Sequence, residues 1–548
     1  MNSPAEQFRR IEADYHRAWL RYHPEAAVDV GIADHADQLR SYNEDDTGAL
    51  IALNRKLLSA LDELSPDDLD EVAAVDFRIL RGAASVELHE LEASDWRYRN
   101  PAEYVPVHAI YQLLTQPVNN VHTAVKRRLE AIPDYLRGAR TLLQQAPEHV
   151  VPVWLQSAVE QCESGAVFMR DLVRSPLVSR LFNNPAKLQP VFDEAAHALT
   201  GFARFLENDI APHARGDFAC GRPHFERLLN EKHFLDTDAD SVLRLGERLL
   251  QQCREQLHEQ ARKMQGHDDV PALLDKIRAQ HPSRDSLLDV YRDRLRHAHD
   301  WLQQADLISL PQQQALKLQA TPAFMQPLIP FAAYEPPSVI DPQQQGRYYV
   351  TLADETGLQE HNLCSIDLTC AHEAFPGHHL QFVLANRANA GRLTRLLNES
   401  ASLYEGWALY SEQLVIEQGG LSRDEHRVMM LRDRLWRCLR IIIDVGLQTG
   451  SLSLQQAQEL LQNEPGFDTD QAAGEISWYS SAPATPLCYA TGCEMILAAR
   501  EQIAGDDSTG LKAFHDALLS QGSIALPLVL QQTFGDSLWR QVHKAVFD

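Results

Sequence analysis

Apolar residues recur at spacings of three and four through most of the chain between Met1 and Ala320, and this period is the strongest constraint on what the chain can fold into. Two runs that show it are Phe8, Ile11, Tyr15, Trp19 and Tyr22 near the start, and Val242, Leu245, Leu249, Cys253 and Leu257 further along. Strand-like alternation of apolar and polar residues is scarce in this region. It is therefore predicted to consist of amphipathic helices.

The helical pattern is interrupted where prolines accumulate. Six of them lie close together and exclude a continuous helix: Pro322, Pro327, Pro330, Pro336, Pro337 and Pro342. Directly afterwards, residues 346–352 are rich in aromatic and β-branched side chains and form the best strand candidate. After Asp367 the pattern is helical again, with breaks near Gly419, Pro465 and Pro483. We therefore expect a mostly α-helical chain.

The charge balance of the chain limits its partners. Its 548 residues include 51 Lys and Arg and 76 Asp and Glu, which gives a net charge of −25 at pH 7. Such a chain repels phosphate backbones and anionic lipid surfaces, so nucleic acids and membranes are not expected as partners. The first residues lack the basic start and apolar run of a secretory signal, and no apolar run is long enough for a membrane span. The expected location is the cytoplasm.

Several common kinds of site are excluded by missing motifs. The eight cysteines include no C-x-x-C pair, which argues against a disulfide framework and against a thiolate zinc site. Most of them are expected to be small buried residues. The serine-hydrolase elbow, the phosphate-binding loop and the dinucleotide fingerprint are also absent from the sequence.

A cluster of histidines in the second half of the chain carries the strongest chemical signal. His372, His378 and His379 lie within eight residues, beside Glu373. In the zincin motif H-E-x-x-H, two histidines four apart share one helix face and hold one metal ion, while the Glu activates a water molecule. Here the fourth residue after His372 is Pro376. On a regular helix His378 would be rotated by about 120° from His372, and His379 would lie about 10.5 Å further along.

Pro376 is expected to resolve this mismatch by disrupting the helix. It has no N–H for the carbonyl of His372, its ring clashes with that carbonyl, and Gly377 tolerates unusual dihedral angles. A bulge that extrudes two residues would give His378 the missing fourth position. His372 and His378 are thus the predicted ligand pair, and His379 is either the rival for the second place or a donor that faces the substrate.

A site with one position open for water needs a third protein ligand, and two glutamates qualify. Glu399 follows His378 at a spacing that is common in zincins, and Glu405 lies further along the chain. Glu405 is preferred, because E-G-W-A-L-Y-S-E resembles the N-E-G-F-A-x-Y segment whose Glu is the third zinc ligand in aminopeptidase-type gluzincins. Glu399 stays the alternative, or a carboxylate that holds a ligand imidazole. Glu405 and Glu412 also lie in a largely apolar run, where acidic side chains are costly unless a cation compensates them.

These two segments together resemble a bacterial family catalogued as domain of unknown function 885. The motifs that carry the resemblance are H-E-A-x-P-G-H-H-L-Q at 372–381, E-G-W-A-L-Y-S-E at 405–412, P-E-A-A at 24–27, G-x-Y-Y at 346–349 and R-x-x-x-D-x-G at 440–446. They span nearly the whole chain. The sequence departs from the family pattern at Gln448, where a His is usual, and within residues 483–492, where a Gln and a Lys are missing.

The resemblance implies a multi-layer helical, zincin-like fold of the neurolysin or carboxypeptidase kind, with a small β element next to the active-site helix. It also implies the chemistry of a zinc metallopeptidase. Residues 1–340 would form the walls of a cleft and residues 341–548 would carry the metal site, within one continuous structural unit.

The chemistry then assigns roles to single residues. Glu373 would act as general base for the metal-bound water and pass its proton to the leaving amine. Tyr489 is the first candidate for a donor to the oxyanion, and His379 is the second. Tyr489 as a packed aromatic residue is the equally weighted alternative.

Two further features each allow two interpretations. The residues Tyr348 to Val350 could be an edge strand that pairs with an extended peptide, or part of a simple hairpin. Arg437 and Arg440 could hold a substrate carboxylate. An ion pair between Arg440 and Asp444, four residues apart on one predicted helix, is the favoured interpretation.

The sequence thus predicts a zinc-dependent hydrolase with one Zn²⁺ per chain, a metallopeptidase that cleaves short peptides. A metal-dependent amidase or esterase acting on a non-peptide substrate is the alternative enzyme. A non-catalytic, metal-binding scaffold protein is the alternative outside the enzymes. The expected partner is a peptide or a small amide, and the oligomeric state is left open.

Overall fold

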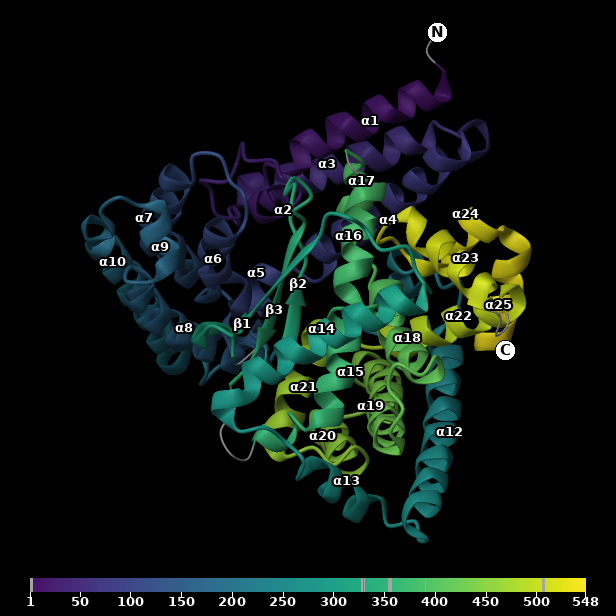
Figure 1. Ribbon diagram of the computed structural model, residues 1–548. Coiled ribbons are helices and arrows are strands. Elements are labelled where there is room, and N and C mark those ends of the chain that lie inside the picture. Colours follow the sequence, from purple (N-terminus) through teal and green to yellow (C-terminus); the bar gives the residue numbers. More distant parts are fainter. Residues whose placement is uncertain (1–2, 327–328, 330, 353–356, 390, 505–507) are drawn as a thin grey trace. The chain divides into compact units, whose positions relative to one another are not determined.

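The structure, a computed structural model, describes residues 3–326, 329, 331–352, 357–389, 391–504 and 508–548 (Figure 1). It is mostly helical, as predicted, and its small β element is a three-stranded mixed sheet. Its contacts define two units. The first comprises Met1–Phe218, Pro322–Pro327 and Ser338–Asp341, and the second comprises Ala219–Thr321, Leu328–Pro337 and Pro342–Asp548. The roles expected for residues 1–340 and 341–548 stay predictions.

The first unit is helical throughout its described secondary structure, apart from short turns. Its helices are α1 (Pro4–Trp19), α2 (Pro24–Asp29), α3 (Glu44–Asp62), α4 (Glu71–Ala93), α5 (Trp96–Arg99), α6 (Val107–Thr115), α7 (Val121–Leu143), α8 (Pro152–Leu172), α9 (Pro176–Leu181) and α10 (Gln189–Phe205).

An apolar cluster holds α1, α3 and α4 together. Its buried members are Phe8, Tyr15, Leu57, Leu61, Ala73, Phe77, Leu80 and Ala84. Ile11 and Trp19 pack against it from partly buried positions, so the period of three and four in α1 is confirmed. The helix begins with a capping box in which Ser3 and Glu6 bond to each other's backbone N–H groups.

One half-buried carboxylate joins these helices. Glu87 of α4 accepts hydrogen bonds from Asn54 Nδ2 at 2.7 Å and from Trp19 Nε1 at 3.0 Å, and His23 Nε2 lies 2.9 Å from its other oxygen. Asn54 in turn accepts from the hydroxyl of Tyr15 at 2.8 Å. Each polar group of this network therefore has a partner, which is what burial demands.

The second unit holds the remaining helices and the sheet. Its helices are α11 (Arg222–Arg227), α12 (Ala239–Gln265), α13 (Val270–Arg278), α14 (Leu287–Ala305), α15 (Leu363–Glu373), α16 (His378–Ala388), α17 (Leu393–Leu396), α18 (Tyr404–Glu417), α19 (Asp424–Thr449), α20 (Leu454–Asn463), α21 (Thr469–Ser481), α22 (Cys488–Ile503), α23 (Ser508–Leu518), α24 (Leu526–Phe534) and α25 (Asp536–Phe547). The predicted apolar run from Val242 to Leu257 is buried along α12, and this helix packs on α19.

The sheet has the strand order β1–β3–β2, with β1 (Ala315–Ala320), β2 (Ala332–Glu335) and β3 (Gln345–Val350). The predicted strand at 346–352 is confirmed as β3. It pairs in parallel with β1 and antiparallel with β2, so it is the central strand. The interpretation of Tyr348 to Val350 as an open edge strand is therefore wrong. β2 contacts α15, which places a small β element beside the helix that carries His372.

The two outer strands lie where the sequence predicts helix or irregular chain. In β1, Leu316 and Leu318 alternate with Lys317 and Gln319, which is a strand pattern in a run of only six residues. β2 lies among the prolines, where composition excludes a helix but does not indicate a strand. Pro327 and Pro330 lie outside the described residues.

The predicted breaks in the second half of the chain are confirmed. Gly419 follows the end of α18, Pro465 lies between α20 and α21, and Pro483 lies between α21 and α22. Seven of the eight cysteines are buried, as expected, and Cys220 is half-buried.

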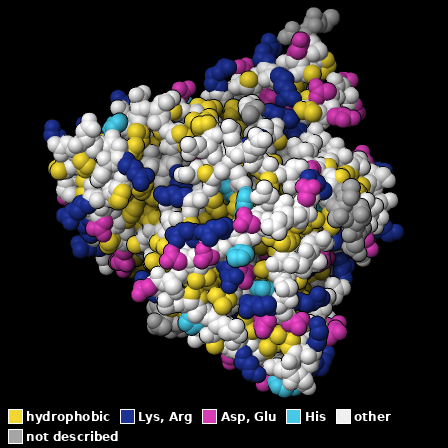
Figure 2. Space-filling view, viewed as in Figure 1, with side chains coloured by type: hydrophobic (Ala, Val, Ile, Leu, Met, Phe, Trp, Pro, Cys, Tyr) yellow, Lys and Arg dark blue, Asp and Glu magenta, His cyan; other side chains and the backbone are white. Residues whose placement is uncertain are grey.

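Acidic and basic side chains lie among one another on the face that Figure 2 shows. Over the described part of the chain, no single helix has the length and apolar character needed to cross a membrane. One pair of helical segments bent by 118°, Gly510–Gln521 with Leu526–Phe534, meets the same criteria taken together.

Candidate metal centre

The helix that carries His372 ends one residue later, and His378 begins the next helix. Cys370 O accepts the N–H groups of Ala374 and Phe375, both at 3.1 Å, and Ala371 O accepts from Gly377 N at 2.9 Å. Four residues thus lie between α15 and α16, and the Phe375–Pro376 peptide bond is cis. The predicted bulge within one continuous helix is wrong. The chain instead forms two helices with Pro376 in the turn between them.

The consequence expected from that bulge is confirmed. The imidazole rings of His372 and His378 lie side by side, with centroids 4.9 Å apart and ring planes at 89°. Trp407 of α18 donates its indole N–H to Pro376 O at 2.8 Å and so fastens the turn between the two helices. A Cβ on Gly377 would lie 1.7 Å from His372 O, so only glycine fits at this point of the turn.

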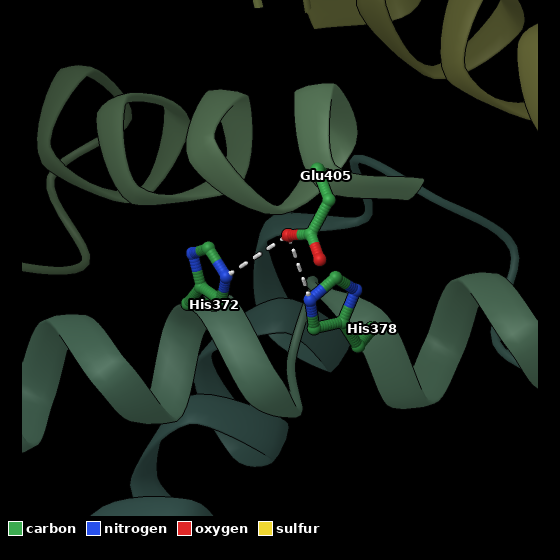
Figure 3. Close-up of side chains that lie close together, drawn as sticks. All are labelled: His372, His378 and Glu405. Carbon is green, nitrogen blue, oxygen red and sulfur yellow. Dashed lines mark ion pairs between the residues drawn. The ribbon is translucent and has the colours of Figure 1, made fainter. Parts of the chain in front are cut away.

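The third member of the group comes from the first turn of α18. Glu405 Oε2 lies 3.4 Å from His378 Nε2 and 3.7 Å from His372 Nε2. In Figure 3 the two imidazoles come from neighbouring helices and the carboxylate reaches toward both. One atom from each of the three residues lies within 4.8 Å of the others, and the group could hold a metal ion.

The donor set fits a divalent transition metal. Glu405 Oε2 is buried and has no hydrogen-bond partner among the described residues. Two imidazole nitrogens and a carboxylate oxygen are typical ligands of zinc, and three protein ligands leave a position open. Burial opposes the charge of Glu405, yet His372 and His378 hold the pKa of its carboxyl well below the ordinary value. Glu405 is therefore ionised, as a metal ligand must be.

A second carboxylate orients His372. Glu412, two turns along α18 from Glu405, lies with Oε1 2.7 Å from His372 Nδ1. A ring whose Nδ1–H donates to this carboxylate presents the lone pair of Nε2 to the centre. Burial alone would lower the pKa of His372, but Glu405 and Glu412 raise it to about 10. Glu412 thus holds a ligand imidazole, a role that was one of the two predicted for Glu399.

Glu399 lies away from the group. Its side chain is 78 % exposed and forms an ion pair with Lys232 at 3.5 Å. The geometry therefore favours Glu405 as the third ligand.

His379 faces a different neighbour from His378. Its Nδ1 lies 3.0 Å from the hydroxyl of Tyr334 in β2, and its ring packs edge-on against Phe375. Burial lowers the pKa of His379 to about 3, which keeps the ring neutral. His379 is not part of the group with Glu405, and its role as a donor stays a prediction. Tyr334 was missed, since an aromatic residue between prolines gives no signal in the sequence.

Glu373 is the last residue of α15 and is next to His372 in the chain. Burial raises the pKa of its carboxyl, and His372, His378 and Arg437 act on it with the opposite sign. Its role as general base stays a prediction.

Tyr489 reaches the centre from α22. Its ring lies parallel to that of His372, with centroids 6.4 Å apart and an interplanar angle of 15°. Burial and the charge of Glu405 raise the pKa of its phenol well above the ordinary value. Tyr489 therefore stays protonated and can donate a hydrogen bond, as its predicted role requires.

Two glycines bring α18 and α22 together at this point. A Cβ on Gly492 would lie 2.1 Å from Ser402 O, and a Cβ on Gly406 would lie 2.5 Å from the carbonyl carbon of Gly492. The backbones are therefore in direct contact one residue from Glu405.

The predicted pairing of Arg440 with Asp444 is wrong. Arg440 donates to Tyr479 Oη at 2.9 Å and to Glu475 Oε2 at 3.0 Å. Asp444 accepts the backbone N–H groups of Ala484 at 3.2 Å and Leu487 at 3.3 Å. The segment before α22 presents two buried N–H groups that need acceptors, and Asp444 accepts from both.

Comparison with known proteins agrees with the motifs. The sequence profile of the family described as "Bacterial protein of unknown function (DUF885)" matches residues 24–532. No curated protein is significantly similar to the chain in sequence. The fold is similar to two solved structures described as putative lipoproteins.

The first, from Shewanella oneidensis, is of unknown function; it is 20 % identical, with a TM-score of 0.76 over 96 % of this chain and 99 % of that one. The second, from Colwellia psychrerythraea, is 17 % identical, with a TM-score of 0.78 over the full length of both chains.

Proposed function

We propose that this chain, which belongs to the bacterial DUF885 family, is a zinc-dependent hydrolase that cleaves short peptides. The observation that carries the proposal is the convergence of His372 Nε2, His378 Nε2 and the unpartnered Glu405 Oε2 on one point, with Glu373 beside them. Three ligands and a neighbouring carboxylate are the parts that a hydrolytic metal site needs. The zincin-like, metallopeptidase-like fold that the family resemblance implies belongs to the same proposal.

Each residue around the group has a separate role in the proposed reaction. Zinc held there would polarise the reacting carbonyl and lower the pKa of a water molecule. Glu373 would take a proton from that water and deliver it to the leaving amine. Tyr489 would donate to the oxyanion, with His379 as the second candidate. Glu412 would keep the ring of His372 in place.

A purely structural metal is the weaker alternative, because structural zinc sites are usually closed by four protein ligands. The group here offers three, and no further His, Cys, Asp or Glu among the described residues joins it. An amidase or esterase would use the same parts, so the class of substrate has to come from assays.

The cellular location separates two proposals. The sequence motifs predict the cytoplasm, whereas the two solved structures are described as putative lipoproteins, which favours the cell envelope. Fractionation of cells that express the full-length gene from its own start distinguishes them.

The first experiment is metal analysis of protein purified without an affinity tag or added metal. We expect about one zinc per chain in the wild type and in His297→Ala, which removes an exposed imidazole outside the group. His372→Ala should contain none. Zinc that persists in His372→Ala would overturn the assignment of the site. Cleavage of a peptide mixture, followed by mass spectrometry, then tests peptidase activity against simple amides and esters.

A further inference from the structure

Two arginines of α19 lie next to the candidate metal centre. Arg440 Cζ is 4.4 Å from the ring centroid of Tyr489, and that ring is 6.4 Å from the ring of His372. These two distances together are the upper limit on the separation of the Arg440 guanidinium from the His372 imidazole. Arg437, one turn earlier on α19, interacts electrostatically with Glu373.

Among the described residues, the one carboxylate that pairs with Arg437 is distant and shared. It is that of Asp433, at 3.9 Å from Arg437 and already 2.9 Å from Arg432. Arg437 donates from one terminal nitrogen to Asp433 O at 3.3 Å, whereas its Nε is buried and without a hydrogen-bond partner among the described residues. A guanidinium donates through all three of its nitrogens, and the N–H on Nε of Arg437 has no acceptor among the described residues.

Arg440 is in a similar state. Glu475 and Tyr479 take two of its nitrogens, but the third, Nη1, is buried and unpartnered within the described part of the chain. Its side chain is 5 % exposed and that of Arg437 is 12 % exposed. Leaving donors of a buried cation unpaired is costly, which points to an anion that is not part of the protein.

Aromatic rings hold both guanidiniums in place. Trp436 packs against both, with its ring centroid 3.9 Å from Arg437 Cζ and 4.2 Å from Arg440 Cζ. Trp478 lies 5.0 Å from Arg440 Cζ and edge-on to Tyr489. Such stacking fixes the plane of a guanidinium, and a fixed plane favours two parallel hydrogen bonds to one carboxylate.

Aromatic rings surround His378 at the centre. The rings of Tyr334, Phe382 and Tyr404 lie with their centroids 6.0 to 6.3 Å from its imidazole. A ligand bound at the centre would thus meet the guanidiniums near Tyr489 and aromatic rings near His378. A peptide end with a free carboxylate matches this polarity.

We propose that Arg437, with Arg440 behind it, binds the C-terminal α-carboxylate of the substrate, so that the enzyme removes residues from the carboxyl end of peptides. The proposal rests on the hydrolase function proposed above. Water adds across one peptide bond: the acyl carbon gains the oxygen, the C–N bond breaks, and the amine leaves with the proton. Since neighbouring Cα atoms are about 3.8 Å apart, the upper limit on the separation of Arg440 from His372 restricts the leaving group to roughly one or two residues.

The test compares a peptide mixture with free carboxyl ends against the same mixture with amidated ends, using the zinc-loaded full-length chain. Mass spectrometry should show loss of one or two C-terminal residues, with kcat/KM about ten to a hundred times higher for the acids. Arg437→Ala should erase this preference by raising KM, and Arg437→Lys should retain part of it because it keeps charge without the fork. Arg427→Ala, an exposed position on the same helix, is the matched control and should keep the preference.

A binding experiment keeps this proposal distinct from the hydrolase itself. Calorimetric titration of Glu373→Gln with N-acetyl-Ala-Ala-Phe and with its amide should show tighter binding of the acid, dependent on Arg437. Equal cleavage of acids and amides would overturn the carboxylate site and leave the hydrolase standing. Selective binding of the acid without cleavage of any peptide would support the carboxylate site and overturn the hydrolase function. Binding of neither peptide would overturn the carboxylate site as well.

Discussion

Helices α1, α3 and α4 of the first unit and helices α15, α16 and α18 of the second treat buried polar side chains in opposite ways. In the first group, Glu87 has three partners within hydrogen-bond distance. In the second group, Glu405 Oε2, His378 Nδ1 and Glu412 Oε2 are buried without a hydrogen-bond partner among the described residues. The first arrangement is complete as a folded chain, whereas in the second Glu405 Oε2 gains a partner when a cation binds between it and the two imidazoles. We call these two regions the N-terminal bundle and the metal centre.

The largest expected effect is on turnover and belongs to the metal centre. Glu373→Gln should lower kcat by about 10²- to 10⁴-fold, because the amide cannot accept the proton of the water. Zinc content and thermal stability should stay at the wild-type level, since the shape of the side chain is kept. Activity assays with metal analysis of the same sample check this. Unchanged turnover would remove Glu373 from the mechanism.

The N-terminal bundle should respond in stability alone. Phe8 is fully buried in its apolar cluster, so Phe8→Ala should cost about 3 to 5 kcal/mol in the free energy of unfolding. Denaturant titration measures this loss, and Phe8→Leu should lose less. The folded fraction should still bind about one zinc per chain. A loss of zinc from the folded protein would show that the two regions are coupled.

Adding zinc should stabilise the protein through the metal centre and not through the N-terminal bundle. At a hundred times its Kd, zinc should raise the free energy of unfolding of the wild type by about 2.7 kcal/mol, because it binds the folded state. Thermal unfolding in zinc and in chelator gives the difference. The increment should vanish in His372→Ala and persist in Phe8→Ala. An equal increment in His372→Ala would indicate that zinc binds elsewhere.

The crossing of α18 and α22 links packing to the metal centre. Gly492→Ala should cost about 1 to 3 kcal/mol, since its Cβ would meet Ser402 O at 2.1 Å, and zinc affinity should fall with it. Gly474→Ala in α21, where no atom lies within 4 Å of the added Cβ, is the matched control. That change should stabilise the protein by about 0.5 to 1 kcal/mol. Unfolding curves and zinc titrations of both variants test the pair.

The smallest effect depends on pH and belongs to the N-terminal bundle. Burial alone would raise the pKa of Glu87, but His23, Asn54 and Trp19 outweigh burial and hold the pKa below its ordinary value. A carboxyl with a depressed pKa stabilises the fold at pH values above its unfolded pKa, and this contribution is lost as the pH falls through the folded pKa. Glu87→Gln should therefore cost on the order of 1 kcal/mol at pH 7 and less in acid. A difference in the free energy of unfolding between the two proteins that is the same at all pH values would contradict this.

The N-terminal bundle could be predicted from the sequence because its helices have one apolar and one polar face. The helices of the metal centre could not be recognised in this way, since α15 and α18 are buried on most sides and their pattern is set by chemistry. There the information lay in residue types: two histidines, a proline and acidic residues in an apolar run. These predicted the pair His372 and His378, and the resemblance of E-G-W-A-L-Y-S-E to a known ligand segment added Glu405 to the group.

Other features depended on partners distant in the chain. β1 and β2 become strands by pairing with β3, and six- and four-residue runs carry little pattern of their own. The true partners of Arg440 and Asp444 come from α21 and from the segment before α22, which no local spacing indicates. The same holds for Tyr334, which reaches His379 from the sheet.

The turn at Gly377 has a consequence for how relatives are judged. A codon for glycine becomes one for alanine by a single base change, and the added methyl group would lie 1.7 Å from His372 O. Such a protein would keep every ligand residue of the motif and yet hold the two imidazoles apart. A motif search that checks only the ligand residues would classify it as active. The residue between the proline and the histidines carries equal weight when genomes are searched for working copies of this centre.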